Sequence, residues 1–287
     1  MIDNYNLNES FPGDTEYYSQ SFSNRYMNWK RRHTIISALN KLLFRTQDKN
    51  LRILEIGCFD GSLIFKINRL FSGFDISFTG IDLSPAGISF ALKRKSDEQI
   101  KNCDFLIMDA AKLSFADNSF DIIIATEVIE HFPAPELLLC EILRVLKPDG
   151  KVIITSPNGG IVFSRFIASL FWKFVIKPIF FITSGRKIIT EYPQHSLNGR
   201  TEEGIGHGHV SVKSARAWKV IMRAAGFKIN KLSGTGGLVF GDPFIDTHRI
   251  MFGFSIIMDT LLEKLPYSHL TSEILQFELS KNDYKIY

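Results

Sequence analysis

The chain has 287 residues, of which 34 are basic and 30 are acidic, so its formal net charge is only +4. Such a small net charge gives no reason to expect a nucleic-acid partner. The length allows one large domain with an insertion. Three cysteines, Cys58, Cys103 and Cys140, lie in or beside apolar segments without paired spacing. We expect these thiols to be buried and the protein to lie in a reducing, cytoplasmic compartment. This cysteine pattern excludes a disulfide scaffold.

The first predicted element is a helix from about residue 17 to residue 44. The segment before it is polar and lacks the basic and apolar parts of a signal peptide. Within this helix lies a basic run, Lys30 to His33, which we interpret as a solvated helix face.

A short apolar strand, an acid and a glycine turn follow between Leu51 and Gly61. Such a turn at a helix N-terminus is typical of nucleotide-binding sites, because glycines let the backbone approach a ligand closely. The spacing from Gly57 to Gly61 differs from the Gly-x-Gly-x-x-Gly of dinucleotide sites, which disfavours a nicotinamide-dependent reductase. The next helix is predicted from apolar residues spaced for one buried face, namely Leu63, Ile64, Ile67 and Leu70.

Further strand-like runs alternate with helical patterns and predict an α/β fold with a doubly wound, mostly parallel sheet. The runs span residues 76–81, 105–108, 120–125 and 151–155, and a helical pattern at 135–146 closes at 147–150. In such sheets ligands bind outside the carboxyl ends of the strands. A shared site is therefore predicted where four strands end in an acid: Glu55, Asp82, Asp109 and Glu127.

This pattern resembles the class I S-adenosylmethionine-dependent methyltransferases over about residues 50–158, and more loosely over 206–233. The matching segments are residues 55–61, 80–84, 108–110, 120–131 and 144–150. The resemblance implies a Rossmann-like sheet of seven strands, in which the last strand is antiparallel and inserted between its neighbours. A helix at 213–225 and strands at 227–232 and 274–279 would complete this sheet.

The resemblance also implies S-adenosylmethionine as the cofactor. In the family the first loop holds the methionine part, the acid after the second strand binds the ribose hydroxyls, and the next two strand ends reach the adenine edge and the methyl-transfer end. The residues in or beside these positions are Glu55, Gly57, Cys58, Gly61, Asp82, Leu83, Asp109, Ala110 and Glu127. The chain departs from the family at Phe59, where many members carry a third glycine, and we expect Phe59 to reshape the methionine pocket.

An apolar segment at residues 161–182 interrupts the predicted domain. It contains three cations and Pro178, which count against a membrane-spanning helix. A helix at a membrane surface, a lid over an apolar acceptor, and a helix packed on the core or in a homodimer interface all remain open. A second apolar stretch, 250–262, could complete the same pocket. We expect an N-terminal helical cap (1–50), a methyltransferase domain (51–160 and 206–287) and an insertion (161–205).

Three histidines, His131, His207 and His209, are the candidate catalytic residues, because a neutral imidazole can take the proton from an acceptor hydroxyl. Alternatively, Glu127, Glu130, His131 and one later histidine could bind a divalent cation, an interpretation that the spacing alone does not favour. A Glu-x-x-Glu-His segment with a later histidine resembles the small-RNA 2′-O-methyltransferases and the ubiquinone-biosynthesis O-methyltransferases.

The predicted function is in-line O-methylation of a hydrophobic small molecule or of a lipid-linked or glycan intermediate. The chain would act in the cytoplasm, with peripheral membrane contact through 161–182 and no nucleic-acid partner. The alternative is a non-catalytic, membrane-associated binding protein that keeps the fold, an interpretation that Phe59 supports.

Overall fold

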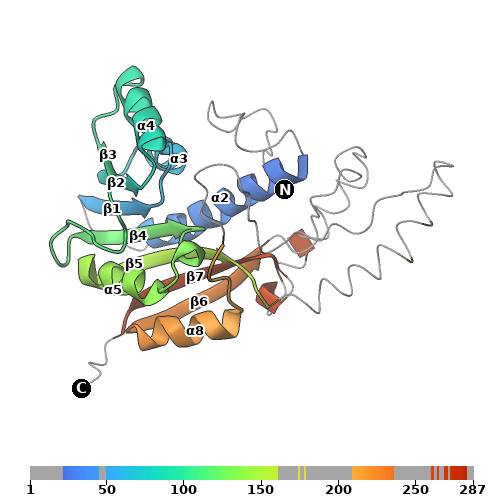
Figure 1. Cartoon of the computed structure of the whole chain (residues 1–287). Helices are drawn as coiled ribbons and strands as arrows, with labels where there is room; N and C mark the ends of the chain where they lie inside the picture. Colours follow the sequence, from blue (N-terminus) through green and yellow to red (C-terminus); the bar gives the residue numbers. More distant parts are fainter. Residues whose placement is uncertain are drawn as a thin grey trace.

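The computed structural model describes residues 22–44, 50–160, 209–235, 268–270 and 272–282, together with single positions at 174, 178, 260, 261 and 264. A twisted sheet with helices on both of its faces dominates this part of the chain (Figure 1). The two predicted halves of the domain, before and after the insertion, contribute strands to this one sheet.

The sheet has seven strands in the order β3-β2-β1-β4-β5-β7-β6. Strands β1, β2, β3, β4 and β5 are parallel to one another, and β7 is antiparallel to both of its neighbours, β5 and β6. The predicted mostly parallel sheet with an inserted, antiparallel last strand is therefore confirmed. The bounds are β1 Leu51–Ile56, β2 Ile76–Asp82, β3 Cys103–Ile107, β4 Phe120–Thr126, β5 Leu146–Pro157, β6 Phe227–Thr235 and β7 Ile274–Lys281.

Helices α2, α3 and α4 cover one face of the sheet, and α5 and α8 cover the other (Figure 1). The bounds are α2 Phe22–Leu43, α3 Ser62–Leu70, α4 Pro85–Asp97, α5 Pro135–Val145 and α8 Ala215–Ala224, with short 3-10 helices at η1 Ile129–His131 and η3 Ser268–Leu270. Each face has its own buried hydrophobic cluster, which includes Leu39 of α2 on the first side and Trp218 of α8 on the second.

Strand β4 shows why this sequence forms a central strand. Ile122 and Ile124 pack in the cluster beneath α2, α3 and α4, while Ile123 and Ala125 pack in the cluster beneath α5 and α8. Because both faces are covered by helices, the strand is continuously apolar from Ile122 to Ala125 instead of alternating with polar residues. This burial holds the carboxyl end of β4 in place, and Glu127 and η1 follow directly after it.

Three local expectations were wrong. Strand β5 begins at Leu146 and not after residue 150, because the ladder with β4 shifts its register and accommodates residues 147–150 inside the strand. Lys147 at this shift pairs with Asp121 on β4, with 2.7 Å between Nζ and Oδ1. Leu70 is 55% exposed because α3 ends there, and Cys140 lies on the exposed side of α5, unlike the buried Cys58 and Cys103.

Several expectations lie outside the described residues. These expectations concern the apolar stretch 161–182 apart from positions 174 and 178, most of the second apolar stretch 250–262, and the candidate catalytic residue His207. Within the described part of the chain, none of the helices has both the length and the apolar composition needed to cross a membrane.

Candidate cofactor and acceptor site

A cavity of about 610 Å³ lies at the carboxyl ends of β1, β2 and β4. This is the edge of the sheet where open α/β folds bind their ligands. The loops after these strands form its floor, α2 contributes Asn28, Arg31 and Arg32, and the segment before α8 contributes His209. Residues that are distant in the sequence thus line one continuous space.

The loop after β1 depends on Gly57. This residue has φ +74°, and a Cβ added to it would lie 2.3 Å from Cγ2 of Val128 in the loop after β4. The amides of Gly57 and Cys58 both donate to the carbonyl oxygen of Ile81 at the end of β2, at 2.8 and 3.0 Å. Only glycine satisfies both the backbone conformation and the close contact between the two loops.

Asp82, at the end of β2, is held by backbone amides. Its Oδ2 accepts from the amide of Phe59 and its Oδ1 accepts from the amide of Ser84, both at 2.8 Å. Ser84 in turn caps α4 by accepting from the amide of Gly87 at 3.1 Å. Because each carboxylate oxygen can accept about two hydrogen bonds, Asp82 retains capacity for a ribose diol.

Phe59 occupies the position where many family members have glycine, and its φ of +46° explains that preference. Its side chain is only 36% exposed and lies against the first turn of α4, where a Cβ added to Gly87 would be 2.7 Å from Cδ2 of Phe59. Phe59 also lines the cavity, so its ring forms part of the cavity wall.

Glu55 is the acid nearest the cofactor loop and is 4% exposed. Burial raises the pKa of this carboxyl well above its ordinary value, and the charge of Arg32 opposes that shift. Its Oε2 makes no hydrogen bond with any described group. A buried, unsatisfied acceptor beside the glycine loop fits the ammonium of an amino-acid ligand.

The loop after β4 forms the opposite end of the cavity. Glu127 has φ +54°, and its amide donates to both the carbonyl oxygen and the hydroxyl of Thr155 on β5, each at 3.2 Å. Its Oε2 lies 3.8 Å from a guanidinium nitrogen of Arg31, which reaches down from α2. This pair connects the helical cap to the sheet directly over the cavity.

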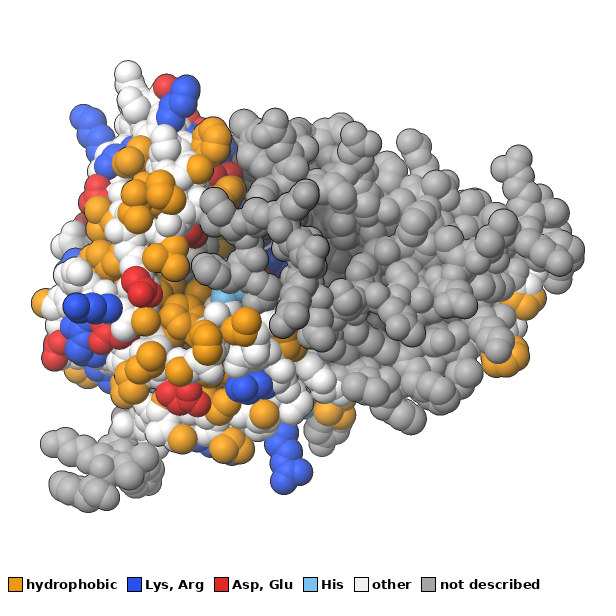
Figure 2. Space-filling view, in the orientation of Figure 1, with side chains coloured by type: hydrophobic (Ala, Val, Ile, Leu, Met, Phe, Trp, Pro, Cys, Tyr) orange, Lys and Arg blue, Asp and Glu red, His pale blue; other side chains and the backbone are white. Residues whose placement is uncertain are grey.

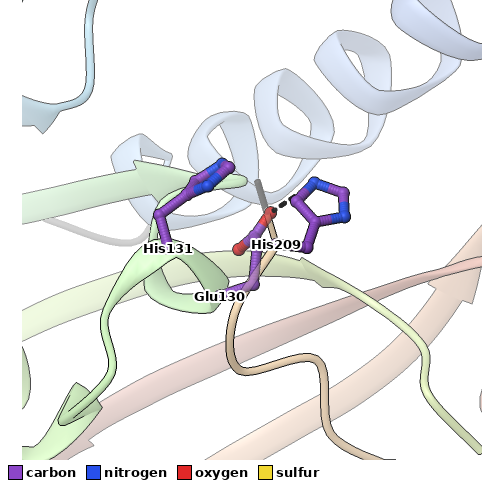
Figure 3. A group of neighbouring side chains, drawn as sticks. All are labelled: Glu130, His131 and His209. Carbon is purple, nitrogen blue, oxygen red and sulfur yellow. Dashed lines mark ion pairs between the residues drawn. The ribbon is translucent and has the colours of Figure 1, made fainter. Parts of the chain in front are cut away.

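Glu130, His131 and His209 form a cluster at this end, with the carboxylate between the two imidazole rings (Figure 3). Oε1 of Glu130 lies 3.9 Å from Nε2 of His209, and the two ring centroids are 5.1 Å apart. The carbonyl oxygen of Glu130 accepts from the amides of Val210 and Ser211, at 3.0 and 2.9 Å. These two bonds hold the segment that carries His209 against η1.

Burial controls the charge of this cluster. Glu130 is fully buried, and burial, together with the nearby charge of Glu127, raises its pKa well above the ordinary value. Burial likewise lowers the pKa of His209, and the neighbouring His131 lowers it further. The imidazole of His209 is therefore neutral at pH 7 and can accept a proton or bind an electrophile.

Most of the predicted site residues lie together. Glu55, Gly57, Cys58, Asp82, Leu83, Ala110, Glu127, His131 and His209 all line the cavity. Gly61 and Asp109 do not: Gly61 precedes α3 with φ +71°, and Asp109 accepts from the amide of Ala111 at 2.8 Å. Cys58 is buried, and burial strongly raises the pKa of its thiol, so it contributes as a small apolar side chain.

Sequence reasoning missed the contribution of α2. The basic run was expected to be a solvated face, but Lys30 is 6% exposed and Arg31 and Arg32 line the cavity. The two adjacent arginines were visible in the sequence, but the register that turns them inward depends on the packing of Leu39 and its neighbours. Apolar side chains complete the cavity wall, namely Met108, Val128 and Phe132. Figure 2 shows hydrophobic side chains on the face of the molecule seen in Figure 1, with a histidine visible among them.

Comparison with known proteins agrees with this geometry. A family model described as "Methyltransferase domain" matches residues 47–177. Phosphoethanolamine N-methyltransferase 2 of Caenorhabditis elegans is 40% identical over 87 residues, which cover 30% of this chain and 20% of that protein. A phthiotriol/phenolphthiotriol dimycocerosates methyltransferase of Mycobacterium leprae is 37% identical over 99 residues (34% and 35%). A fatty-acid O-methyltransferase of Mycolicibacterium smegmatis is 34% identical over 104 residues (36% of each chain).

The matches to these curated relatives span between a fifth and about a third of their length, so they bear on the shared domain alone. Among solved structures, the PH0226 protein of Pyrococcus horikoshii OT3 aligns over 95% of this chain and 96% of its own, with a TM-score of 0.52 and 19% identity. The [4+2]-cyclase SpnF aligns over 86% and 80%, with a TM-score of 0.52 and 21% identity. Both likenesses establish the fold.

The residues of the cavity fit S-adenosylmethionine. Asp82 offers acceptors for the ribose hydroxyls, Glu55 offers an unsatisfied carboxylate oxygen beside the glycine loop, and Met108, Leu83 and Ala110 supply an apolar wall. The family match and the seven-stranded sheet identify residues 47–177 as part of a class I S-adenosylmethionine-dependent methyltransferase domain.

Proposed function

We propose that the protein transfers a methyl group from S-adenosylmethionine to a hydroxyl of a hydrophobic acceptor, such as a lipid, a lipid-linked compound or a glycan intermediate. The observation that carries this proposal is that one cavity joins Asp82 to His131 and His209. A ligand at the first end and an acceptor at the second would meet inside it. The relatives named for fatty-acid O-methylation and for phthiotriol derivatives support an apolar acceptor.

In this proposal the cofactor supplies a methyl group already activated by its sulfonium. The chain aligns the reactants, because the loops after β1, β2 and β4 are locked to one another through Ile81, Asp82 and Val128. Helix α2 closes over the cavity through the pair between Arg31 and Glu127 and limits the access of water.

The acceptor oxygen forms its bond to the methyl carbon as the bond from that carbon to sulfur breaks, and the electron pair of the broken bond stays on sulfur. The hydroxyl proton leaves at the cluster of Glu130, His131 and His209. In this proposal the proton passes to Nε2 of His209 or to Nδ1 of His131, and Nδ1 of His131 has no hydrogen-bond partner among the described residues. His207 remains a further candidate outside the described residues.

The test is transfer of isotope-labelled methyl to extracted lipids and to defined fatty acids, phenols and glycolipids. We expect label in an apolar product, and a His209→Ala variant to transfer about 10²–10⁴-fold more slowly, because an acid–base group contributes that much. An ester releases its label in mild base, whereas an ether or a methylamine does not, so hydrolysis distinguishes methylation of a carboxyl oxygen from methylation of an alcohol, a phenol or an amine. A folded chain that fails to bind S-adenosylhomocysteine would contradict the proposal and favour a non-catalytic binding protein.

A further inference from the structure

Phe59 holds a backbone conformation that its side chain disfavours. Its φ of +46° lies in the left-handed region, which a bulky L residue enters only at a cost in free energy. The other non-glycine residues with positive φ in the described part of the chain are Asn50, Gln99, Asn118 and Glu127. The first three are exposed, whereas Phe59 and Glu127 line the cavity. Backbone strain at a cavity wall is typical of positions that serve ligand binding.

Gly87 makes room for the ring of Phe59. It is a buried residue in the first turn of α4, and its backbone is helical, without the positive φ of Gly57 and Gly61. The helix itself therefore does not require glycine at this position, and alanine would favour helix formation. A Cβ added to Gly87, however, would lie 2.7 Å from Cδ2 of Phe59 and 3.0 Å from its carbonyl carbon and oxygen.

The two residues thus depart from local preference in opposite directions. The loop has a bulky residue where its backbone favours glycine, and the helix has a glycine where its backbone favours a larger residue. Natural sequences break such local preferences mainly at functional sites. Both departures are explained if the position of the Phe59 ring is what matters.

The ring lies beside the acid proposed to bind the ribose. The amide of Phe59 donates to Oδ2 of Asp82 at 2.8 Å, and Phe59, Asp82 and Leu83 all line the cavity. Helix α4 blocks one side of the ring at Gly87, so the ring is confined between the first turn of the helix and the cavity. A ligand whose ribose hydroxyls bind Asp82 would have its sugar next to this ring.

We propose that Phe59 is a specificity-determining residue for the cofactor: its ring packs against the ribose of S-adenosylmethionine, and Gly87 allows it to take that position. The ring contributes apolar area to the contact and excludes water from the hydrogen bonds of Asp82, which strengthens them. The contacts of Phe59 with α4 and Asp82 support the adenosine part, and not the methionine part, as its target. This inference rests on the cofactor binding of the proposed function and is independent of the acceptor.

The test is calorimetric titration of the full chain with S-adenosylhomocysteine and, separately, with 5′-methylthioadenosine, which keeps the adenosine and the sulfur but lacks the amino-acid part. We expect Phe59→Gly to weaken the binding of both ligands by a similar factor of about tenfold, since one aromatic contact contributes on that order. Phe90→Ala is the matched control and should leave both affinities unchanged, because Phe90 lies on α4 but is 62% exposed and outside the cavity.

Gly87→Ala tests the pairing of the two residues. The added methyl group forces the ring away from α4 and into the cavity, so both affinities should again fall by about tenfold. In the Phe59→Gly background, Gly87→Ala should cause little further loss. Only the contacts of 3.0 Å to backbone atoms of residue 59 would remain there, and a small shift relieves them. Losses that simply add in the double variant would overturn the pairing.

Urea unfolding of each variant separates ligand binding from folding. We expect the midpoint of Phe59→Gly to stay at or above that of the wild type, because glycine releases the strain at a φ of +46°. If Phe59→Gly does not fold, Gly87→Ala decides by the same two affinities.

Two results would overturn the inference while leaving the proposed function intact. The first is a folded Phe59→Gly variant that binds both ligands as tightly as the wild type, which would make the ring a structural feature only. The second is a loss confined to S-adenosylhomocysteine, which would place the ring at the methionine part. A folded wild-type chain that binds neither ligand would contradict the proposed function as well.

Discussion

The two ends of the cavity are built in different ways. At the cofactor end, backbone groups define the geometry: the amides of Gly57 and Cys58 donate to Ile81, and Asp82 is held by the amides of Phe59 and Ser84. At the acceptor end, side chains define it, and many of their atoms have no partner among the described residues. These atoms are Nε of Arg31, Oε1 of Glu127, both carboxylate oxygens of Glu130 and Nδ1 of His131.

In the proposed function, this difference follows from what each end would bind. A loop whose amides and carboxylate are fixed before binding holds one invariant ligand without reorganisation. Buried polar atoms without partners carry a cost that a ligand can recover, and a few substitutions can change what they bind. Glu55 is the exception at the cofactor end, because its Oε2 is also unsatisfied among the described residues.

The largest expected effect is at Asp82. Asp82→Ala removes the acceptor of the Phe59 and Ser84 amides together with the proposed ribose contacts. Hydrogen bonds to a charged group contribute about 1.5–3 kcal/mol each, so losing two should lower the affinity for S-adenosylmethionine by about 10²–10⁴-fold. Calorimetry would measure this loss. Asp109→Ala, outside the cavity, is the control, and an equal loss in that variant would refute the distinction between the two acids.

A smaller effect is expected when the contact between the two ends is altered at Gly57. Gly57→Ala places a Cβ 2.3 Å from Val128 at a positive φ, so the free energy of unfolding should fall by about 2–5 kcal/mol. Urea unfolding measures this change, and adding Val128→Ala should restore the part that is due to the clash.

Gly73→Ala is the matched control for Gly57→Ala, because no described atom lies within 4 Å of the added Cβ and no positive φ is involved. Its effect on the free energy of unfolding should stay within about 0.5 kcal/mol. Equal losses at Gly57 and Gly73 would show that the contact between the loops does not determine the stability of the cofactor end.

The smallest effect concerns the pH dependence of Glu55. Its pKa is raised above 4.5 by burial, so the folded chain retains a proton that the unfolded chain releases near pH 4.5. The free energy of unfolding should therefore fall as the pH rises from 4.5 to the raised folded pKa, by up to about 1.4 kcal/mol per pH unit for this one group. Glu55→Gln should remove that part of the slope.

Urea unfolding of the ligand-free chain between pH 5 and pH 8 measures this slope, with the exposed Glu136→Gln as the control. Glu130 contributes in the same direction, so Glu55→Gln should flatten the slope without abolishing it. If Glu55→Gln leaves the slope unchanged, the pKa of Glu55 is not raised in the folded chain. Glu55 would then be no exception at the cofactor end, where backbone groups define the geometry.

The sequence predicted the sheet well, and it placed the residues at the strand ends on one edge of that sheet for the same reason. Strand periodicity, the acids at strand ends and the glycine turn are local features, and the topology of a doubly wound sheet brings strand ends to one edge. Gly57, Asp82 and Glu127 could thus be placed from their positions along the chain. Gly61 and Asp109 were correctly assigned to that edge but not to the cavity wall, since a strand end does not determine where a side chain points.

The sequence by itself determined the fold class and the strand–glycine-turn–helix segment around Gly57, because these depend on patterns within short segments. The inserted, antiparallel last strand followed from the family resemblance and is confirmed by the sheet. Tertiary structure alone decided that Arg31 and Arg32 turn into the cavity, that residues 147–150 lie within β5, and that His209 meets Glu130. Glu130 and His209 are 79 positions apart, and the hydrogen bonds from the amides of Val210 and Ser211 to the carbonyl oxygen of Glu130 bring them together. Contacts of that kind arise from packing, which no local pattern encodes.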